Sequence, residues 1–399
     1  MITADPQTRT VRLAEISAIL ARVAAPEDRD LLLSFAPVVY AEMPDRIALQ
    51  LPVEALAAKI QEHFRFVVRE MPPAFQLYKG LPGLHVCARN PGEAEARAYG
   101  AGGGLPLETT IVETHSLDAP FIFESLKNYF QKAGLRVFST LHPMFAVRRQ
   151  WERIVWIGSS QEEGSKESFC HFQIERIDSK ERLRRIEHEI HSVLKAVFTA
   201  VEDFKDMVRF VRETAPRLKP RRGNARDVES ARAFLEWLLD DNYILLGTAC
   251  YRLGADGLPD RIPESASGVF TDATLLPVVF PRVIEEVETR VRLALDDDRI
   301  VDIDYCNNAT AIYHLEPIDD IVIREWNGDG SLGQATVLRG ASPEAPSPRK
   351  PRTSLLSRRS RTGSSRRAVP FPTPTPTGRF VGCSTDSRSG SCSTPTCRA

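Results

Sequence analysis

LDAPFIFESLKNYFQKAGLRV, residues 117–137, is the stretch that decides the fold of this chain. The carboxylate of Asp118 can cap a helix, and Pro120 suits a first helical turn, where its missing N–H is not needed. Gly134 is placed to end the helix in a left-handed conformation. Apolar side chains between these points share one helical face: Ile122, Leu126, Tyr129, Phe130 and Ala133. The stretch therefore predicts one amphipathic helix set between strands.

Short β-branched or alternating segments flank this helix. They predict strands at residues 109–114 (TTIVET), 135–141 (LRVFSTL), 153–158 (RIVWIG) and 168–176 (SFCHFQIER). In the last strand one face carries Cys170, Phe172 and Ile174, and the other carries His171, Gln173 and Glu175. Together these segments predict a β-α-β-β-β-α sandwich within residues 107–215.

A long helix is predicted after these strands, at residues 178–214. Asp178 and Glu181 have the spacing of a capping box, and Pro216 marks the end of the helix. Its apolar residues keep one heptad register: Leu183, Ile186, Ile190, Val193, Val197, Ala200, Phe204, Met207 and Val211. Such a seam needs a partner helix, and we favour one in the same chain over one in another subunit.

The 399-residue chain has room for two or three domains, and its patterning divides it further. Residues 1–106 predict a helical region with breaks at Pro37, Pro44, Pro52 and Pro72, followed from residue 76 by a loop. A linker at 216–225 leads to a second unit at 226–338. That unit predicts a helix at 227–241, strands at 242–253, 300–305, 310–315 and 320–326, a helix at 283–295 and a hairpin turn at Asn327–Gly330.

The net charge of −1 conceals a strongly basic end. From Ala341 onward there are 11 basic and 2 acidic residues, so this part carries +9 and the rest carries −10. Residues 339–399 are rich in Arg, Ser and Pro without periodicity, which predicts disorder. Such a tail could bind nucleic acid or an anionic membrane, but we favour a truncated gene or one read out of frame near residue 339.

Several classes of protein are excluded by composition. The seven cysteines show no paired spacing through residue 340, which argues against a disulfide framework or a zinc ribbon. The N-terminus lacks the pattern of a secretory signal, and no apolar run is long enough to span a membrane. We therefore predict a cytoplasmic protein.

Candidate chemistry in the sequence is sparse. The glycine-rich GAGGG is followed by Leu105 and Pro106 instead of a helix, so it predicts a surface loop and no phosphate site. His188 and His191 lie three residues apart, whereas zinc proteases use a spacing of four. Acidic runs at 296–298 and 302–304 fit polar strand faces and turns better than a metal site. We predict no catalytic, cofactor-binding or metal-binding residue, and Cys170 faces away from His171.

Several segments of the chain together resemble one known protein family. The relevant segments are DAPFIFES (118–125), LHPMFAVRR (141–149), ESFCHFQIER (167–176), AFLEWLLDDNYILLGTACYRL (233–253) and the strand-rich residues 307–338. Over residues 20–338 the chain resembles the N-terminal regulatory, ACT-like region of the large bacterial NAD-dependent glutamate dehydrogenases. The resemblance implies an α+β fold with a helical N-terminus, two ACT-like α/β sandwich units with antiparallel-type sheets, and a disordered C-terminal tail.

The resemblance also implies a function. That family converts L-glutamate, NAD and water to 2-oxoglutarate, ammonia and NADH in amino-acid catabolism. We expect this chain to be a regulatory portion without the catalytic domain, inactive alone and without a cofactor of its own. The alternative is a stand-alone amino-acid-sensing or oligomerisation protein.

The regulatory portion and the stand-alone protein imply the same kinds of partner. They are a second copy of the chain or other domains of the full-length enzyme, and an amino-acid effector; we expect neither a membrane nor nucleic acid. The candidate effector-binding residues are Asp118 and Pro120, at the strand-to-helix turn, and His142, beside a strand of the same unit.

Overall fold

The structure is a computed structural model that describes only part of the chain. The described residues are 6–68, 83–92, 108–150, 153–221, 225–272, 298–309, 312 and 317–341, all within one compact unit. Several sequence predictions lie outside them: the break at Pro72, the GAGGG loop, the helix at 283–295, most of the acidic run at 296–298, the strand at 310–315 except Ile312, and the tail beyond residue 341.

The N-terminal region is helical, as predicted. Its helices are α1 (Pro6–Val23), α2 (Arg29–Glu42), α3 (Asp45–Ala48) and α4 (Val53–Val68). Pro37 was predicted to break a helix but lies inside α2. Buried side chains on both sides of it, Phe35 and Val39 among them, stabilise the helix across the missing hydrogen bond.

Two arginines of α1 hold these helices together by capping their ends. Arg9 donates to the carbonyl of Tyr40, in the last turn of α2, at 2.6 Å and to that of Met43, directly after the helix, at 3.0 Å. Arg12 donates to the carbonyl of Ala48 at 2.9 Å, at the end of α3. The last carbonyls of a helix lack their usual N–H partner within the helix, so each guanidinium adds hydrogen bonds to acceptors at these ends.

The first sheet is antiparallel and has six strands. They are β1 (His85–Arg89), β2 (Thr109–Leu117), β3 (Val137–Leu141), β4 (Met144–Gln150), β5 (Arg153–Ser159) and β6 (Ser165–Glu175). Their order is β1-β2-β6-β4-β5, and β3 also pairs with β6. The predicted strands are present, but β4 was not predicted, and β1 replaces part of the predicted loop because it pairs along β2.

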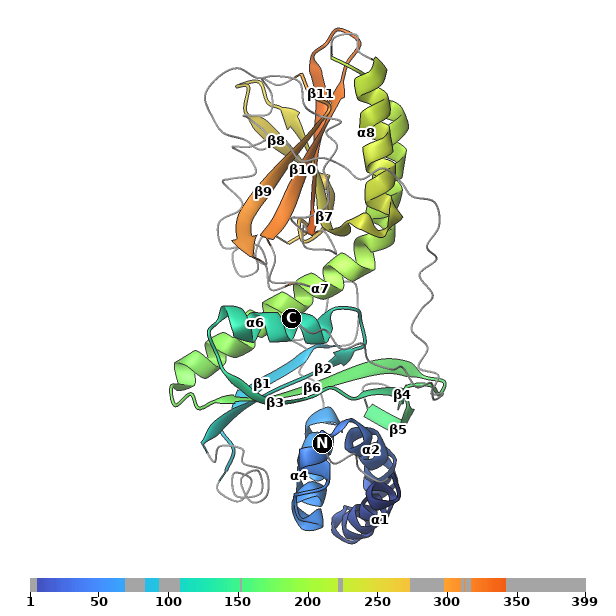
Figure 1. The fold of residues 1–399 in the computed structure, drawn as a ribbon, viewed down its shortest axis with the longest axis vertical. Helices are drawn as coiled ribbons and strands as arrows, with labels where there is room; N and C mark the ends of the chain where they lie inside the picture. Colours follow the sequence, from blue (N-terminus) through green and yellow to red (C-terminus); the bar gives the residue numbers. More distant parts are fainter. Residues whose placement is uncertain are drawn as a thin grey trace, which may run out of the picture. The chain divides into compact units, whose positions relative to one another are not determined.

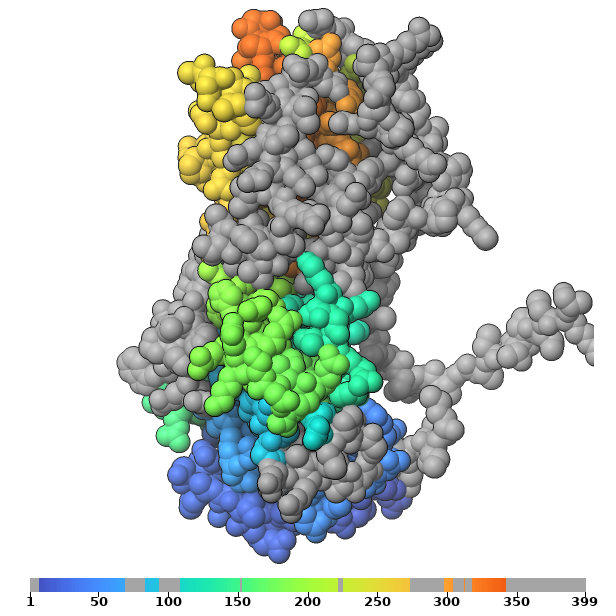
Figure 2. All heavy atoms as spheres, turned by 90° about the vertical axis from the view of Figure 1, so that its left-hand side faces the viewer, coloured from blue at the N-terminus to red at the C-terminus, as the bar shows by residue number. Residues whose placement is uncertain are grey.

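Helices cover both faces of this sheet (Figure 1). The N-terminal helices lie against one face, and α6 (Ile122–Lys132) and α7 (Lys180–Thr214) lie against the other. In the space-filling view the N-terminal helices, in dark blue, lie directly against the cyan strands (Figure 2). The sheet is therefore buried on both sides, and its alternating residues enter two different environments.

Helix α6 confirms the predicted apolar face and stop but not the predicted start. Its face packs in the core, and Gly134 ends it at φ +68°. The Leu135 N–H donates to the Phe130 carbonyl and the Gly134 N–H to the Gln131 carbonyl, which is a Schellman motif. The helix begins at Ile122 after a left-handed Phe121, without a side-chain cap. Asp118 does not cap it because its backbone still pairs with Lys166 of β6.

Helix α7 packs within the same chain, but against sheets more than against another helix. Its seam residues are buried except Leu183 and Phe204, and the helix contacts β1, β7, β8 and α6. The predicted cap at Asp178 is wrong, because Ser179 Oγ accepts the Arg182 N–H at 3.2 Å while Asp178 pairs with Arg176.

The second sheet is also antiparallel, with the order β8-β7-β11-β10-β9. Its strands are β7 (Ile244–Leu253), β8 (Pro259–Gly268), β9 (Val301–Ala309), β10 (Pro317–Trp326) and β11 (Leu332–Ala341). It follows a 3₁₀ turn (Ala215–Arg217), α8 (Ala225–Trp237) and a π-helical turn (Leu238–Asn242). The α+β class with two antiparallel sheets and packed helices is thus confirmed.

The hairpin between β10 and β11 forms at the predicted turn. The Asn327 N–H donates to the Ser331 carbonyl at 2.9 Å, and Gly330 has φ +82°. The regular pattern was predicted to fail at residue 339, but β11 continues to Ala341. Arg339 is buried there because both oxygens of Asp320, on the neighbouring strand, accept from it at 2.9 Å.

Among the helices that the structure describes, none is both long enough and apolar enough to cross a bilayer.

The stop of α6 yields a stability prediction. Gly134→Ala should lower the free energy of unfolding by about 1 kcal/mol, because an L-residue is strained at positive φ. A Cβ there meets no atom within 4 Å, so backbone strain is the only expected cost. Urea denaturation measures the effect. Gly328→Ala is the control, since that glycine has ordinary φ and equal space; equal losses in both variants would contradict the prediction.

Candidate functional site

The face of the first sheet that packs against α4 carries buried ionisable groups. On β6, Cys170, Phe172 and Ile174 point toward α6 and α7, as the alternation predicted. His171 points to the opposite face, and Glu113 lies directly across from it on β2. Burial raises the pKa of the Cys170 thiol to about 12, so this cysteine is no nucleophile at neutral pH.

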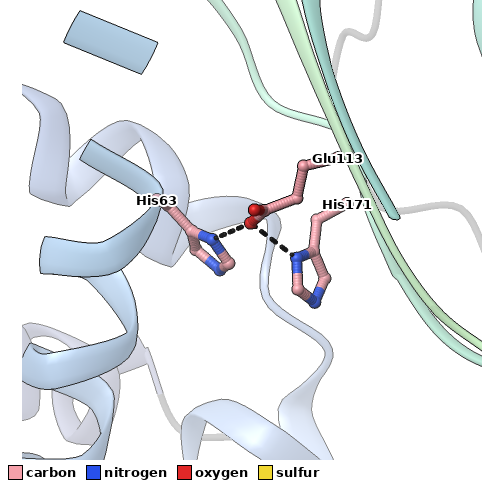
Figure 3. Close-up of side chains that lie close together, drawn as sticks. All are labelled: His63, Glu113 and His171. Carbon is pink, nitrogen blue, oxygen red and sulfur yellow. Dashed lines mark hydrogen bonds and ion pairs between the residues drawn. The ribbon is translucent and has the colours of Figure 1, made fainter. Parts of the chain in front are cut away.

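Two histidines converge on one oxygen of Glu113 (Figure 3). His63 Nδ1, from α4, and His171 Nδ1, from β6, each lie 3.1 Å from Glu113 Oε1. The ring centroids are 4.6 Å apart and the rings are nearly perpendicular. All three side chains are at most 2% exposed. We call His63, Glu113 and His171 the His–Glu–His cluster.

Burial determines the charges in this cluster. It lowers the pKa of His171 to about 3 and also lowers that of His63, although Glu113 opposes both shifts. Burial would raise the pKa of Glu113, but hydrogen bonds from His171 and His63 outweigh it and hold the pKa well below its usual value. At neutral pH two uncharged rings therefore share one carboxylate, and Arg89 Nη2, 3.6 Å from Glu113 Oε2, supplies the opposite charge.

A second buried carboxylate lies on the same sheet. Glu167 on β6 accepts from His115 Nε2 at 2.7 Å and from both Nε and Nη2 of Arg149 at 2.8 Å. Burial alone would raise its pKa, but the bonds from His115 and Arg149 lower it to about 2. The two-pronged Arg149 contact is the strong geometry for a carboxylate, so Glu167 remains charged in the core.

Aromatic rings fill the space around these groups. Phe169 lies 5.1 Å from the ring of His63, and Phe66 stacks on His85 at 4.2 Å. Phe145 stacks on His115 at 5.9 Å. The surroundings are therefore apolar, which strengthens the charged hydrogen bonds of both clusters.

The predicted effector residues lie on the other face of the sheet. His142, between β3 and β4, lies 2.8 Å from Ser168 Oγ through Nε2 and stacks on Phe123 of α6 at 4.8 Å. Burial lowers its pKa, while Asp118 is near enough to oppose that shift. Pro120 is exposed in the adjoining turn. Asp118 and His142 thus come near each other, on the opposite face from the His–Glu–His cluster.

The sequence pattern placed His171 on the face opposite Cys170, but it did not indicate that His171 meets Glu113 and His63. His63 and Glu113 are 50 residues apart in sequence, and Glu113 and His171 are 58 apart. One signal was available: Glu113 is the only charged residue of the predicted strand TTIVET, and a carboxylate inside a buried strand needs a partner.

The EHEIH segment behaves largely as predicted. His188 is exposed and His191 is half-buried on α7. The neighbouring glutamates hold the fold together instead: Glu187 accepts the Ala88 N–H at 2.8 Å and Glu189 accepts the Tyr129 hydroxyl at 2.6 Å.

Residues around the first sheet are similar to a known domain family. Residues 35–190 match the model of the glutamate dehydrogenase ACT1 domain. This segment belongs to that domain family. The match begins within α2 and ends within α7, so the ACT1 domain includes α4, the whole first sheet and every member of the His–Glu–His cluster.

Two full-length relatives agree with this assignment. The NAD-specific glutamate dehydrogenase of Halomonas elongata is 30% identical over 172 residues, which are 41% of this chain and 11% of that protein. The enzyme of the same name from Pseudomonas aeruginosa is 30% identical over 144 residues, 35% of this chain and 9% of that protein. The chain thus aligns with about a tenth of the length of the relatives it matches.

The ACT1 domain contains one set of side chains with the chemistry of a metal centre. Within the described residues, His63, Glu113 and His171 are the group whose donor atoms all lie within 4.8 Å of one another. Two histidines and a carboxylate form a common ligand set for zinc. In the structure the same atoms are joined by hydrogen bonds, which stabilise the contact of α4 with the sheet.

Glu167 yields a prediction about acid stability. The pKa of Glu167 is about 2 in the folded protein, against an ordinary value of 4.5. Its ionised carboxylate therefore contributes fully to the free energy of unfolding above pH 4.5, and this contribution is lost as pH falls toward 2. Glu167→Gln should lower the free energy of unfolding at neutral pH by about 3 kcal/mol, because Arg149 and His115 lose a buried partner. Urea denaturation from neutral pH to about pH 3 should show the difference from wild type shrinking.

The control for that series is Glu163→Gln, an exposed carboxylate in the turn before β6. It should behave as wild type at every pH. A Glu167→Gln deficit that is constant or grows as pH falls would show that the ionised carboxylate is not the stabilising form.

Proposed function

We propose that this chain is a regulatory, non-catalytic part of an NAD-dependent glutamate dehydrogenase. The observation that carries the proposal is the ACT1 match over residues 35–190, which takes in the first sheet and the helices on both of its faces. The relatives are NAD-specific glutamate dehydrogenases, and most of their length has no counterpart in the aligned segments. The reaction, with NAD as its cofactor, is accordingly assigned to other parts of such an enzyme.

The described architecture supports a non-catalytic role. Dinucleotides bind at the carboxyl ends of parallel strands, beside helix N-termini, and both described sheets are antiparallel. Glu113 and His171, whose pKa values are both lowered, are at most 2% exposed. A substrate cannot reach side chains packed between a helix and a sheet, so their task is to hold the domain together.

Helix α7 is suited to carry a signal out of the ACT1 domain. It packs on α6 and β1, where Glu189 and Glu187 make hydrogen bonds, and it also contacts β7 and β8 of the second sheet. Polar contacts fix the middle of the helix next to β8: Asp203 accepts the Gly268 N–H at 2.8 Å, and Lys195 pairs with Asp272 at 2.7 Å. A change at the ACT1 domain therefore has a direct path along one helix.

An assay for hydride transfer tests the proposal. The purified 399-residue chain, incubated with L-glutamate and NAD, should produce no NADH above the background without protein. Absorbance of NADH is the readout, and an active glutamate dehydrogenase in the same buffer is the positive control. Steady NADH formation that scales with chain concentration would refute a non-catalytic role.

A second candidate function is amino-acid sensing, as a stand-alone or self-associating protein. The observation in its favour is the strand-to-helix turn, where Asp118 lies near His142 and Phe121 adopts φ +73°. Backbone strain of this kind is often found where a chain contacts a ligand. A carboxylate and an imidazole at that turn could bind the ammonium and carboxylate of an amino acid.

Calorimetry against the common amino acids tests this candidate. A sensor should bind one of them at micromolar concentration, and Asp118→Asn and His142→Ala should each weaken binding by at least about tenfold through loss of a charged hydrogen bond. His188→Ala, an exposed change on α7, should leave binding intact. Silence across the set would reject sensing by this chain and leave the non-catalytic proposal in place.

A further inference from the structure

We propose that His63, Glu113 and His171 bind one divalent transition-metal ion of the Zn²⁺ class, which joins α4 to the first sheet. The donors come from three separate segments, α4, β2 and β6, so an ion bound by them would tie these elements together. Sequence analysis predicted no metal ligand, because nothing in the spacing of these residues links them. The inference does not rest on the regulatory role proposed above.

The distances between the donors suit such an ion. Zinc binds imidazole nitrogen and carboxylate oxygen at about 2.0–2.2 Å, which places tetrahedral ligands about 3.4 Å from one another. Each histidine Nδ1 lies 3.1 Å from Glu113 Oε1, and the donor atoms all lie within 4.8 Å of one another. To admit the ion, each Nδ1–Oε1 distance has to open by about 0.3 Å, and the two histidine nitrogens have to close from at most 4.8 Å to about 3.4 Å, a side-chain movement of up to about 1.4 Å.

The donor types select the class of metal. Two imidazoles and one carboxylate suit Zn²⁺, Co²⁺ or Fe²⁺, whereas Ca²⁺ and Mg²⁺ prefer oxygen ligands alone. Both rings are already uncharged, so metal binding moves the proton of each ring from Nδ1 to Nε2 and releases none. His63 Nε2 has no hydrogen-bond partner among the described residues, so binding should be weaker than at a zinc site with a complete outer shell.

Arg89 orients the carboxylate for this task. Its Nη2 lies 3.6 Å from Glu113 Oε2, which leaves Oε1 directed at both histidines. The side chain of Arg89 is 32% exposed, so it can turn toward water when a cation enters. Before the ion enters, Glu113 therefore keeps Oε2 for the arginine and leaves Oε1 facing the two histidines.

The second carboxylate on this sheet provides an internal comparison. In that cluster Glu167 has one histidine, His115, and its other partner is Arg149. A guanidinium has no lone pair and cannot bind a metal. The two clusters share burial, charge and aromatic surroundings, and they differ in the second imidazole that a metal would need.

The test measures metal retained by the full-length chain after removal of any affinity tag. Because the cluster is buried, the protein is refolded with excess Co²⁺ or Zn²⁺ and then gel-filtered. Cys383, Cys392 and Cys397 are changed to serine to remove thiolate ligands of the tail. We expect one metal per chain, a Co²⁺ visible spectrum of low coordination number without thiolate charge transfer, and a raised melting temperature.

Variants assign the ligands. His63→Gln, His171→Gln and Glu113→Gln should each reduce retained metal by at least about tenfold and abolish the metal-dependent rise in melting temperature. His115→Gln, in the comparison cluster, and the exposed His188→Ala should retain one metal per chain. Circular dichroism verifies that each variant folds.

The outcome is decisive even if a ligand variant does not fold, because X-ray absorption of the Zn²⁺-loaded parent chain counts its ligands. Two imidazoles with oxygen ligands support the proposal. Failure of the parent chain to retain metal overturns it, and so does retention that is unchanged in all three ligand variants. Glutamate dehydrogenase activity does not enter the test, so its result is independent of the proposed function.

Discussion

The ionised carboxylate of Glu113, buried between α4 and the first sheet, constrains the rest of the ACT1 domain. A carboxylate removed from water is costly unless hydrogen bonds and an opposite charge surround it. His171 reaches it from the neighbouring strand, Arg89 from β1, and His63 from α4. Apolar contacts alone would allow the helices to slide on the sheet, whereas this arrangement accepts α4 only where His63 meets Glu113.

The two faces of the sheet therefore have different physical characters. The face toward α6 and α7 is mainly apolar, with Phe172 and Ile174 packed against helix side chains. The face toward α4 combines apolar packing with two buried carboxylates, Glu113 and Glu167, each paired with histidine and arginine. The N-terminal helices therefore pack on this face through apolar contacts, and the hydrogen bond between His63 and Glu113 fixes where α4 sits.

The buried charges of the domain contrast with its more exposed strand-to-helix turn. Its charged groups are satisfied internally, while the turn near Asp118 and His142 lies closer to solvent on the α6 side. Helix α7 begins on that apolar face and continues to β7 and β8. The strand-to-helix turn and the helix that contacts the second sheet thus pack in one hydrophobic core.

The sequence by itself determined the local elements. The apolar spacing of α6, its stop at Gly134, the alternation of β6 and the hairpin at Asn327–Gly330 are all encoded within a few residues, where periodicity and turn chemistry act. Only the tertiary structure decided which side chains meet. It moved the start of α6 to Ile122, made β1 a strand, and joined His63 to Glu113, because such pairings depend on packing between segments far apart in the chain.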